Sequence, residues 1–191
     1  MEDIRAFIAI ELPDEIKVKL DQLEGQLKAR RLNAKWVAPE SIHLTLKFLG
    51  NISVDSVPNI QEVMEEAALG VPPFRIGVGG VGVFPNPQRV QVIWAGLNGD
   101  LDKLIELQKL VDTGLSKLGF VPESRPFTAH LTVARIRDEA RPTEREAAGK
   151  LAEATPFEAP SFTVETISLM RSQLRREGPI YNRVVSVALV G

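Results

Sequence analysis

The sequence contains two histidines, and both stand in the same tripeptide, His-Leu-Thr. His43 lies in SIHLTLKFLG and His130 lies in FTAHLTVARI, in opposite halves of a chain of 191 residues. An imidazole titrates near pH 6.5, so one histidine can hold a proton while the other is free to accept one. If the two lie close together, they can act as acid and base on a single substrate.

Each tripeptide has the pattern of a β-strand. Side chains at positions i and i+2 of a strand share a face, so His43 and Thr45 are expected to point the same way. The second motif repeats this arrangement with His130 and Thr132. The alternating residues, among them Leu44, are expected to point into the core. Each half of the chain therefore presents one imidazole and one hydroxyl side by side.

Two such pairs facing each other across a cleft suit in-line displacement at phosphorus. One histidine takes a proton from the attacking oxygen, and the other gives a proton to the leaving oxygen. The two threonine hydroxyls can donate to the non-bridging oxygens of the phosphate. Two histidines without an acidic cluster make a poor metal site, so we predict no metal and no cofactor.

The alternative is that each histidine is an ordinary strand residue and each threonine an ordinary β-former. For one motif alone this alternative is the better interpretation. Given the first tripeptide, however, ordinary residue frequencies make Leu-Thr after the only other histidine a coincidence on the order of one in a hundred or less. A duplication would explain the repeat, but not the absence of every other histidine. The catalytic pair is therefore favoured.

The composition predicts a globular cytoplasmic protein. With 44% hydrophobic and 25% charged residues, the chain can bury a core, and no apolar run approaches the roughly 20 residues of a membrane span. The N-terminal MEDIRAFIAIELP is not the pattern of a secretory signal, and cysteine is absent. The net charge of −2 means that a phosphate must be met by local positive charge. Arg125 and Arg135 flank the second histidine, although for any one arginine a solvated surface position is the alternative.

Hydrophobic periodicity predicts alternating strands and helices. Strands are expected near 4–12, 34–37, 89–97, 162–170 and 181–190, and helices from Asp14 onward and near 55–69, 100–119 and 142–154. In both halves a strand and a long helix precede the His-Leu-Thr motif, which suggests an internal duplication. This pattern predicts an α+β fold with two similar lobes that face each other.

The glycine-rich stretch FRIGVGGVGVFPNPQ suggests a nucleotide-binding loop, but such a loop must open directly into a helix. Here Phe-Pro-Asn-Pro follows instead. A strand with bulges is therefore predicted for this stretch.

Four segments together resemble the 2H phosphoesterases, and in particular the RNA 2′,3′-cyclic phosphodiesterases, also called 2′-5′ RNA ligases. They are RAFIAIELP, WVAPESIHLTLKFLG, RPFTAHLTVAR and LMRSQLRREGPIYNRV, which span most of the chain. The resemblance implies a bilobal α+β fold, with an antiparallel sheet and helices in each lobe and the site in the cleft between the lobes. The two interleaved lobes would form one domain over residues 1–191. It also implies metal-independent hydrolysis of a 2′,3′-cyclic phosphate, at an RNA end or in a nucleotide, to a 2′-phosphomonoester.

The resemblance also implies roles for individual residues. His130 would activate water, His43 would protonate the departing 3′ oxygen, and Thr45 and Thr132 would bind the phosphate. The arginine that the family has three residues after the second threonine corresponds to Arg135. By strict alternation Arg135 should lie on the face opposite His130, so it reaches the phosphate only through a bulge or at the end of the strand.

Two further residues beside the first motif are assigned from strand parity alone. Lys47 should share the face of His43 and Thr45, where it could meet a phosphate or the RNA backbone. Phe48 should point into the core and serve packing. Hydrolysis, the reverse ligation that forms a 2′-5′ link, and binding of RNA ends without catalysis remain open, and a monomer is expected.

Overall fold

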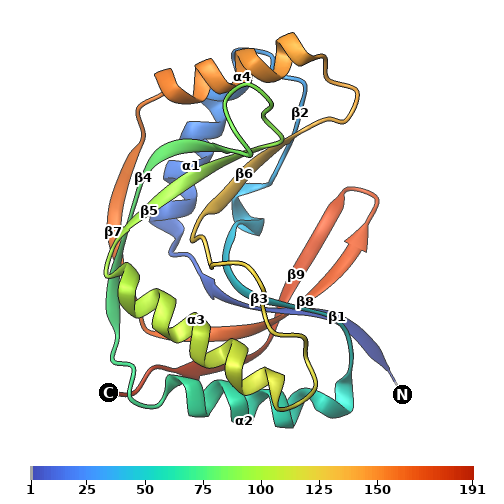
Figure 1. The fold of residues 1–191 in the computed structure, drawn as a ribbon, viewed down its shortest axis with the longest axis vertical. Helices are drawn as coiled ribbons and strands as arrows, with labels where there is room; N and C mark the ends of the chain where they lie inside the picture. The colour runs from blue at the N-terminus through green and yellow to red at the C-terminus, as the bar shows by residue number, and fades with distance from the viewer. Residues whose placement is uncertain (1) are drawn as a thin grey trace.

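The computed structural model describes residues 2–191 and contains two antiparallel sheets (Figure 1). The first sheet has the order β3-β1-β8-β9 and the second the order β2-β6-β5-β4-β7. The strands of the first sheet are β1 (Asp3–Glu11), β3 (His43–Ser53), β8 (Thr166–Arg175) and β9 (Gly178–Ala188). Those of the second are β2 (Ala34–Trp36), β4 (Phe74–Phe84), β5 (Val92–Gly99), β6 (Leu131–Ile136) and β7 (Glu158–Val164).

Four helices flank these sheets, and the predicted α+β fold is confirmed. They are α1 (Asp14–Lys28), α2 (Val57–Ala68), α3 (Leu101–Ser116) and α4 (Pro142–Ala154), and two short 3-10 turns cover Pro39–Ser41 and Val54–Ser56. Apolar residues at helical spacing explain them: Leu104, Leu107, Val111 and Leu115 of α3 are fully buried. Each such side chain stabilises the fold by about 1.5–3 kcal/mol. None of the helices in residues 2–191 has the length and apolarity to span a bilayer.

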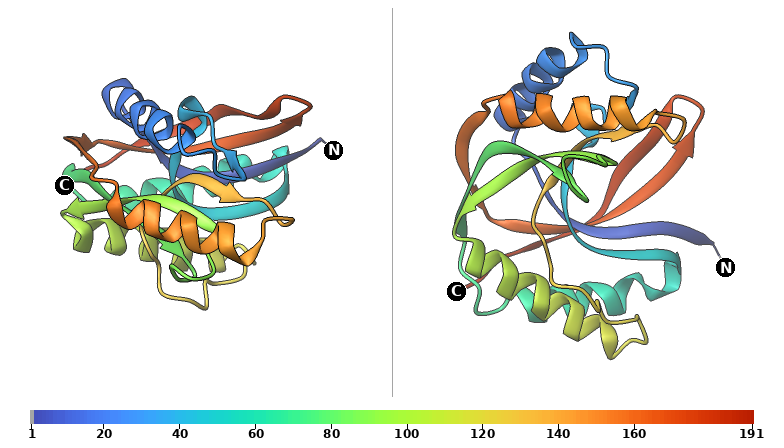
Figure 2. Two further views of the ribbon diagram at one scale, coloured as in Figure 1. Left: turned by 90° about the horizontal axis from the view of Figure 1, so that it is seen from above. Right: turned by 45° about the horizontal axis from the view of Figure 1, so that its top comes forward.

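Two of the helices pack on the sheet that does not contain the strand before them. Helix α1 follows β1 of the first sheet but contacts β7 of the second, and α3 follows β5 of the second sheet but contacts β3 of the first. Figures 1 and 2 show α2 and α3 side by side at one end of the molecule, with α1 and α4 at the other. Helices α1 and α3 therefore help to fix the two sheets relative to each other.

Two of the predicted strands contain an irregularity in the structure. The segment 162–170, predicted as one strand, is divided at Glu165 into β7 of the second sheet and β8 of the first, so that prediction was wrong. The glycine-rich segment forms β4, with a register shift between Val78 and Val81 as predicted. Gly80 adopts φ 77° at this irregularity, a left-handed conformation that glycine allows at little cost.

The inner face of the first sheet carries a small apolar cluster of its own. Phe7, Ala9 and Met170 are buried there, apart from the main core, and Tyr181 packs against them. Because Ile8 and Ile10 of the same strand belong to the main core, β1 is buried on both faces. This rigid central strand forms part of one wall of the site.

Candidate active site

A single cleft of about 680 Å³ contains both histidine motifs. Its walls come from β1, β3, β8 and β9 of the first sheet, from β4 and β6 of the second, and from the segment 117–130 that leads into β6. All six residues singled out in the sequence border it: His43, Thr45, Lys47, His130, Thr132 and Arg135. The structure thus brings together two motifs that stand 87 residues apart in the chain.

Both imidazoles are held by the same backbone contact. Nδ1 of His43 lies 3.0 Å from the carbonyl oxygen of Ser41, and Nδ1 of His130 lies 2.7 Å from that of Thr128. A carbonyl can only accept a hydrogen bond, so Nδ1 of each ring is the donor. Nε2 of each imidazole is therefore left to take a proton from a substrate or, when protonated, to give one.

Two aromatic rings flank each imidazole and restrict its orientation. The ring centroids lie 5.8 Å (Phe7) and 5.3 Å (Tyr181) from that of His43, and 5.0 Å (Phe84) and 6.5 Å (Trp94) from that of His130. Three of these four contacts are edge-to-face, a favourable geometry for aromatic pairs. The imidazoles thus have defined positions before substrate binds.

The surroundings of His43 act on its protonation in opposite directions. Burial lowers the pKa of His43 below its usual value, and Lys17 acts in the same direction. The hydrogen bond to Ser41 and the negative charge of Glu11 partly oppose this shift. In the absence of substrate, the neutral imidazole is therefore favoured.

Glu11 is paired with His43 across β1 and β3. Its Oε2 accepts hydrogen bonds from Nε of Arg183 at 2.7 Å and from Oγ of Ser168 at 2.9 Å. Burial raises the pKa of Glu11, but these two hydrogen bonds and the nearby positive charges outweigh it, so the pKa is lowered. Glu11 is thus held as a carboxylate beside His43.

Both motifs contain a β-bulge at the same place. In the pairing of β1 with β3, Ile8 lies opposite Lys47 and Ala9 opposite Thr45, which leaves Leu46 unpaired. In the pairing of β5 with β6, the same shift leaves Val133 unpaired. The extra residue comes three positions after the histidine in each motif. A bulge of this kind resets the alternation of side chains along the strand.

The bulges place Arg135 and Phe48 in the cleft. Arg135 is exposed and borders the cleft, because the bulge at Val133 returns it to the face of Thr132. Phe48 was predicted in the core, and that prediction was wrong: its side chain is 73% exposed and also borders the cleft. The repeat could have predicted the position of Phe48, since Phe48 and Arg135 both stand five residues after a histidine.

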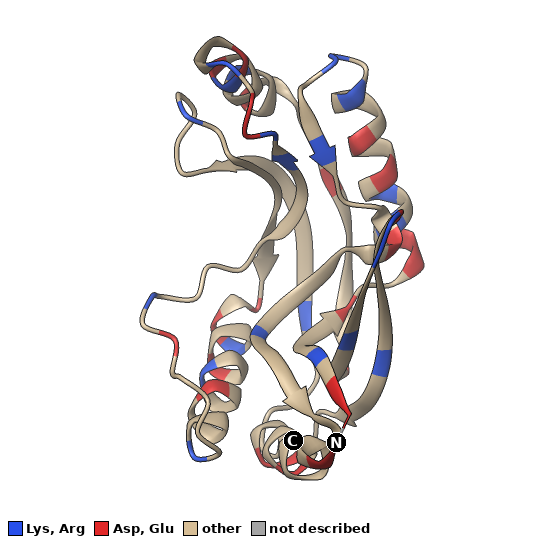
Figure 3. Cartoon of the chain, turned by 90° about the vertical axis from the view of Figure 1, so that its right-hand side faces the viewer, with Lys and Arg blue, Asp and Glu red and all other residues tan. Residues whose placement is uncertain are grey.

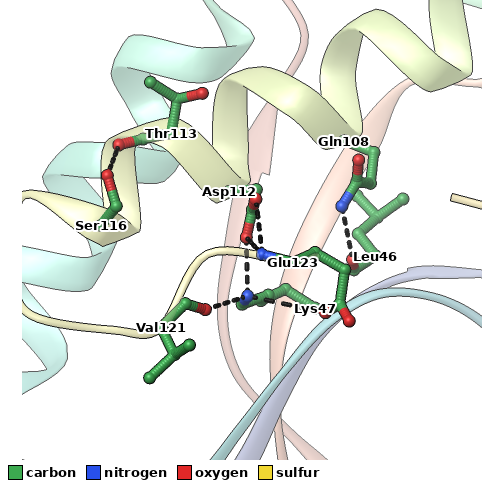
Figure 4. Close-up of polar contacts among 8 residues, drawn as sticks. All are labelled: Leu46, Lys47, Gln108, Asp112, Thr113, Ser116, Val121 and Glu123. Carbon is green, nitrogen blue, oxygen red and sulfur yellow. Dashed lines mark hydrogen bonds and ion pairs between the residues drawn. The ribbon is translucent and has the colours of Figure 1, made fainter. Parts of the chain in front are cut away.

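Lys47 does not share the face of His43, contrary to the prediction from parity. The bulge at Leu46 turns it toward α3, where its side chain is 6% exposed. Nζ of Lys47 lies 2.6 Å from Oδ1 of Asp112 and 2.7 Å from the carbonyl oxygen of Val121 (Figure 4). The ammonium group is therefore bound by the protein itself, at the edge of the cleft.

Positive charge in the cleft comes from individual arginines. Basic and acidic residues are both spread over the chain (Figure 3), and the net charge is −2. Arg5, Arg125 and Arg135 are exposed and border the cleft. Sequence reasoning assigned no role in the site to Arg5, Glu11 or the rings beside the histidines, because they lie on neighbouring strands whose pairing a single sequence does not reveal.

Comparison with known proteins places this chain in a family. The model of the LigT like Phosphoesterase family matches it twice, over residues 10–94 and 97–181. The RNA 2′,3′-cyclic phosphodiesterase of Methanothermobacter thermautotrophicus is 35% identical over 179 residues, which are 93% of this chain and 95% of that protein. The protein of the same name from Aquifex aeolicus is 32% identical over the whole of both chains.

Solved structures agree with this assignment. The protein TT0787 of Thermus thermophilus superimposes with a TM-score of 0.79 and 27% identity, over 97% of this chain and 98% of that one. LigT of E. coli, in its complex with 3′-AMP, gives a TM-score of 0.79 at 24% identity over the full length of both chains, a likeness of fold. The two-lobed fold and the family-model matches define the class of protein: the chain belongs to the LigT-like phosphoesterases, the 2H phosphoesterase family.

Proposed function

We propose that this protein is an RNA 2′,3′-cyclic phosphodiesterase that opens the cyclic phosphate of an RNA end or a nucleotide to a 2′-phosphomonoester. The main support is that two imidazoles border one cleft, each with Nδ1 bound to a backbone carbonyl and Nε2 left for a substrate. Relatives that are 30–35% identical over most of the chain bear the name of this activity.

In the proposed mechanism His130 is the base and His43 the acid. Nε2 of His130 takes a proton from a water molecule, which attacks phosphorus in line with the bond to the 3′ oxygen. That bond breaks as Nε2–H of His43 gives its proton to the departing oxygen, and the phosphate stays on the 2′ oxygen. The two histidines then exchange protons with solvent and return to their starting forms.

The remaining cleft residues bind the phosphate in this proposal. The hydroxyls of Thr45 and Thr132 donate to the non-bridging oxygens, where negative charge grows in the transition state. The guanidinium of Arg135 adds a charge-assisted contact. The bound anion and Glu11 both favour the protonated form of His43 and so oppose the effect of burial on its pKa.

The test is to incubate the protein with nucleoside 2′,3′-cyclic phosphates in EDTA and to identify the product isomer. We expect the 2′-phosphate alone, and no gain in rate when a divalent ion replaces EDTA. Activity lost in EDTA and restored by metal would contradict the metal-free mechanism. Binding without turnover of any cyclic phosphate would favour a non-catalytic module, and faster reaction with RNA 5′-hydroxyl ends than with water would favour ligation.

We further propose that residues 1–191 form one duplicated domain that acts as a monomer on RNA ends. The two matches of the family model, one in each half of the chain, support the duplication. The cytoplasmic location stays a prediction from composition. Light scattering of the purified protein tests the monomer, since a mass twice that of the chain would contradict it.

A further inference from the structure

A cluster of hydrogen bonds around the buried side chain of Lys47 joins β3 to the segment 117–130. Oδ1 of Asp112, on α3, accepts from Nζ of Lys47 at 2.6 Å, and Oδ2 of Asp112 accepts from the backbone nitrogen of Glu123 at 3.0 Å. Lys47 also donates to the carbonyl oxygen of Val121 at 2.7 Å. Figure 4 shows that these groups converge on the ammonium of Lys47 from both α3 and the loop. The side chains of Lys47 and Asp112 are 6% and 15% exposed, so water competes little for the ion pair between them.

A second contact fixes the same part of β3 to α3. Nε2 of Gln108, one helical turn before Asp112, lies 3.4 Å from the carbonyl oxygen of Leu46 (Figure 4). Leu46 is the extra residue of the bulge and has no partner in the pairing of β1 with β3. Helix α3 therefore contacts the bulge through two side chains on one face.

This cluster connects the two histidine motifs. Lys47 stands four residues after His43, and Glu123 stands seven residues before His130. The segment from Lys117 to His130 contains no helix or strand, and it leads from α3, which packs on the first sheet, to β6 of the second. On the way it presents Arg125 and Thr128 to the cleft. Without an anchor, a segment of this length would hold neither residue in a fixed position.

We propose that Lys47 and Asp112 are positioning residues: their ion pair anchors the segment 117–130 and thereby sets the place of His130 and Arg125 in the cleft. The duplication is broken at this point, because Ala134 occupies the position in the second motif that Lys47 occupies in the first. The anchor therefore acts on the segment of one histidine only, the one assigned as the base. The kinetic part of this inference depends on the proposed function, and the structural part does not.

The first test is a double-mutant cycle with Lys47→Met and Asp112→Asn, measured as kcat and KM on a nucleoside 2′,3′-cyclic phosphate. A displacement of His130 by about 1 Å could lower kcat by about 100-fold. We expect Lys47→Met to lower kcat by roughly 10- to 100-fold with a smaller change in KM. The double variant should lose less than the product of the two single losses, because both substitutions break one anchor.

Lys150→Met is the matched control, since Lys150 forms an exposed pair with Glu146 on α4, away from the cleft. It should leave kcat and KM unchanged. If Lys47→Met raised KM alone while kcat stayed constant, Lys47 would bind substrate directly and the inference would be wrong. Independent, multiplicative losses in the cycle would also overturn it.

The second test needs no activity. Endoproteinase Glu-C cleaves after glutamate, and Glu123 lies within the anchored segment. We expect Lys47→Met and Asp112→Asn to accelerate cleavage at Glu123, while cleavage at Glu177 in the β8–β9 turn keeps its rate. With two histidines in the chain, the His130 imidazole signal in NMR is simple to assign, and it should shift or broaden in both variants.

These structural readouts separate the two possible failures. If the unmodified protein turned over no cyclic phosphate, the proposed function would be wrong. The protease and NMR measurements would still test whether the Lys47–Asp112 pair holds the segment 117–130 in place. If Lys47→Met were too unstable to purify, the measurements on Asp112→Asn would decide. This variant is the milder of the two, because asparagine can still accept one hydrogen bond from the loop. Unchanged cleavage at Glu123 together with an unchanged His130 signal would overturn the inference.

Discussion

Phe48 and Arg135 occupy equivalent positions in the two halves of the chain. Each stands five residues after its histidine, and in each strand a bulge three residues after the histidine turns the side chain into the cleft. The same bulge thus presents an aromatic ring on one wall of the cleft and a cation on the other. The backbone geometry is repeated in the two halves, whereas the side chain that it presents differs.

Replacing Arg135 by glutamine should weaken phosphate binding. Loss of a hydrogen bond to a charged group costs about 1.5–3 kcal/mol, or roughly 10- to 100-fold in kcat/KM. Arg137→Gln is the matched control, because Arg137 lies two residues further along and outside the cleft. The measurements are kcat/KM and the inhibition constant of inorganic phosphate. Equal effects of the two variants would show that Arg135 has no contact with the phosphate.

The roles of the two histidines can be separated with a substrate that carries sulfur in place of the bridging 3′ oxygen. Alanine at either position should lower the rate on the ordinary cyclic phosphate by about 10²- to 10⁴-fold. A thiolate needs no protonation to leave, because thiols ionise near pH 8.5, about the reference value of cysteine. His43→Ala should therefore recover most of its rate on the sulfur substrate, and His130→Ala should not. The opposite pattern would show that His130 is the acid and His43 the base.

Replacing Glu11 by glutamine should lower the pKa of His43 further. The Glu11 carboxylate raises the pKa of His43, so removal of its charge favours the neutral imidazole at any given pH. Glutamine keeps an oxygen that can accept from Arg183 and Ser168, so the geometry is preserved. The limb of the pH–rate profile that His43 controls should move to lower pH, and the His43 NMR signal should titrate at lower pH.

Glu2→Gln provides the control for that experiment, because Glu2 pairs with Arg171 at the other end of β1. Its pH–rate profile should match that of the unmodified protein. A His43 titration that did not move in Glu11→Gln would show that the Glu11 charge does not reach the imidazole.

Two glycine substitutions should change stability in opposite directions. A Cβ atom added at Gly149 of α4 would overlap the carbonyl oxygen of Pro87, so Gly149→Ala should destabilise the protein by about 1–3 kcal/mol. Gly25 of α1 has open space around it, so Gly25→Ala should stabilise by about 0.5–1 kcal/mol. Urea unfolding measures both, and cyclic phosphate turnover should be unchanged in Gly25→Ala.

Much of the fold follows from patterns within single elements. Ile16, Leu20, Leu23 and Leu27 recur at helical spacing in α1, and all four are buried. The glycine-rich stretch could be recognised as a strand because two prolines, and not a helix, follow it. These predictions succeed because the period of a helix or strand is a local property that a short window reveals.

The sequence by itself was enough to single out the candidate catalytic residues, since the two His-Leu-Thr motifs repeat in one chain, and both histidines and both threonines border the cleft. Only the tertiary structure decided where the residues after them point. A bulge exists only in the pairing of two strands, so parity along one strand could not place Lys47, Phe48 or Arg135. For the same reason Glu11 and Asp112 could not be foreseen: strand pairing and helix packing bring them to His43 and Lys47 from distant parts of the chain.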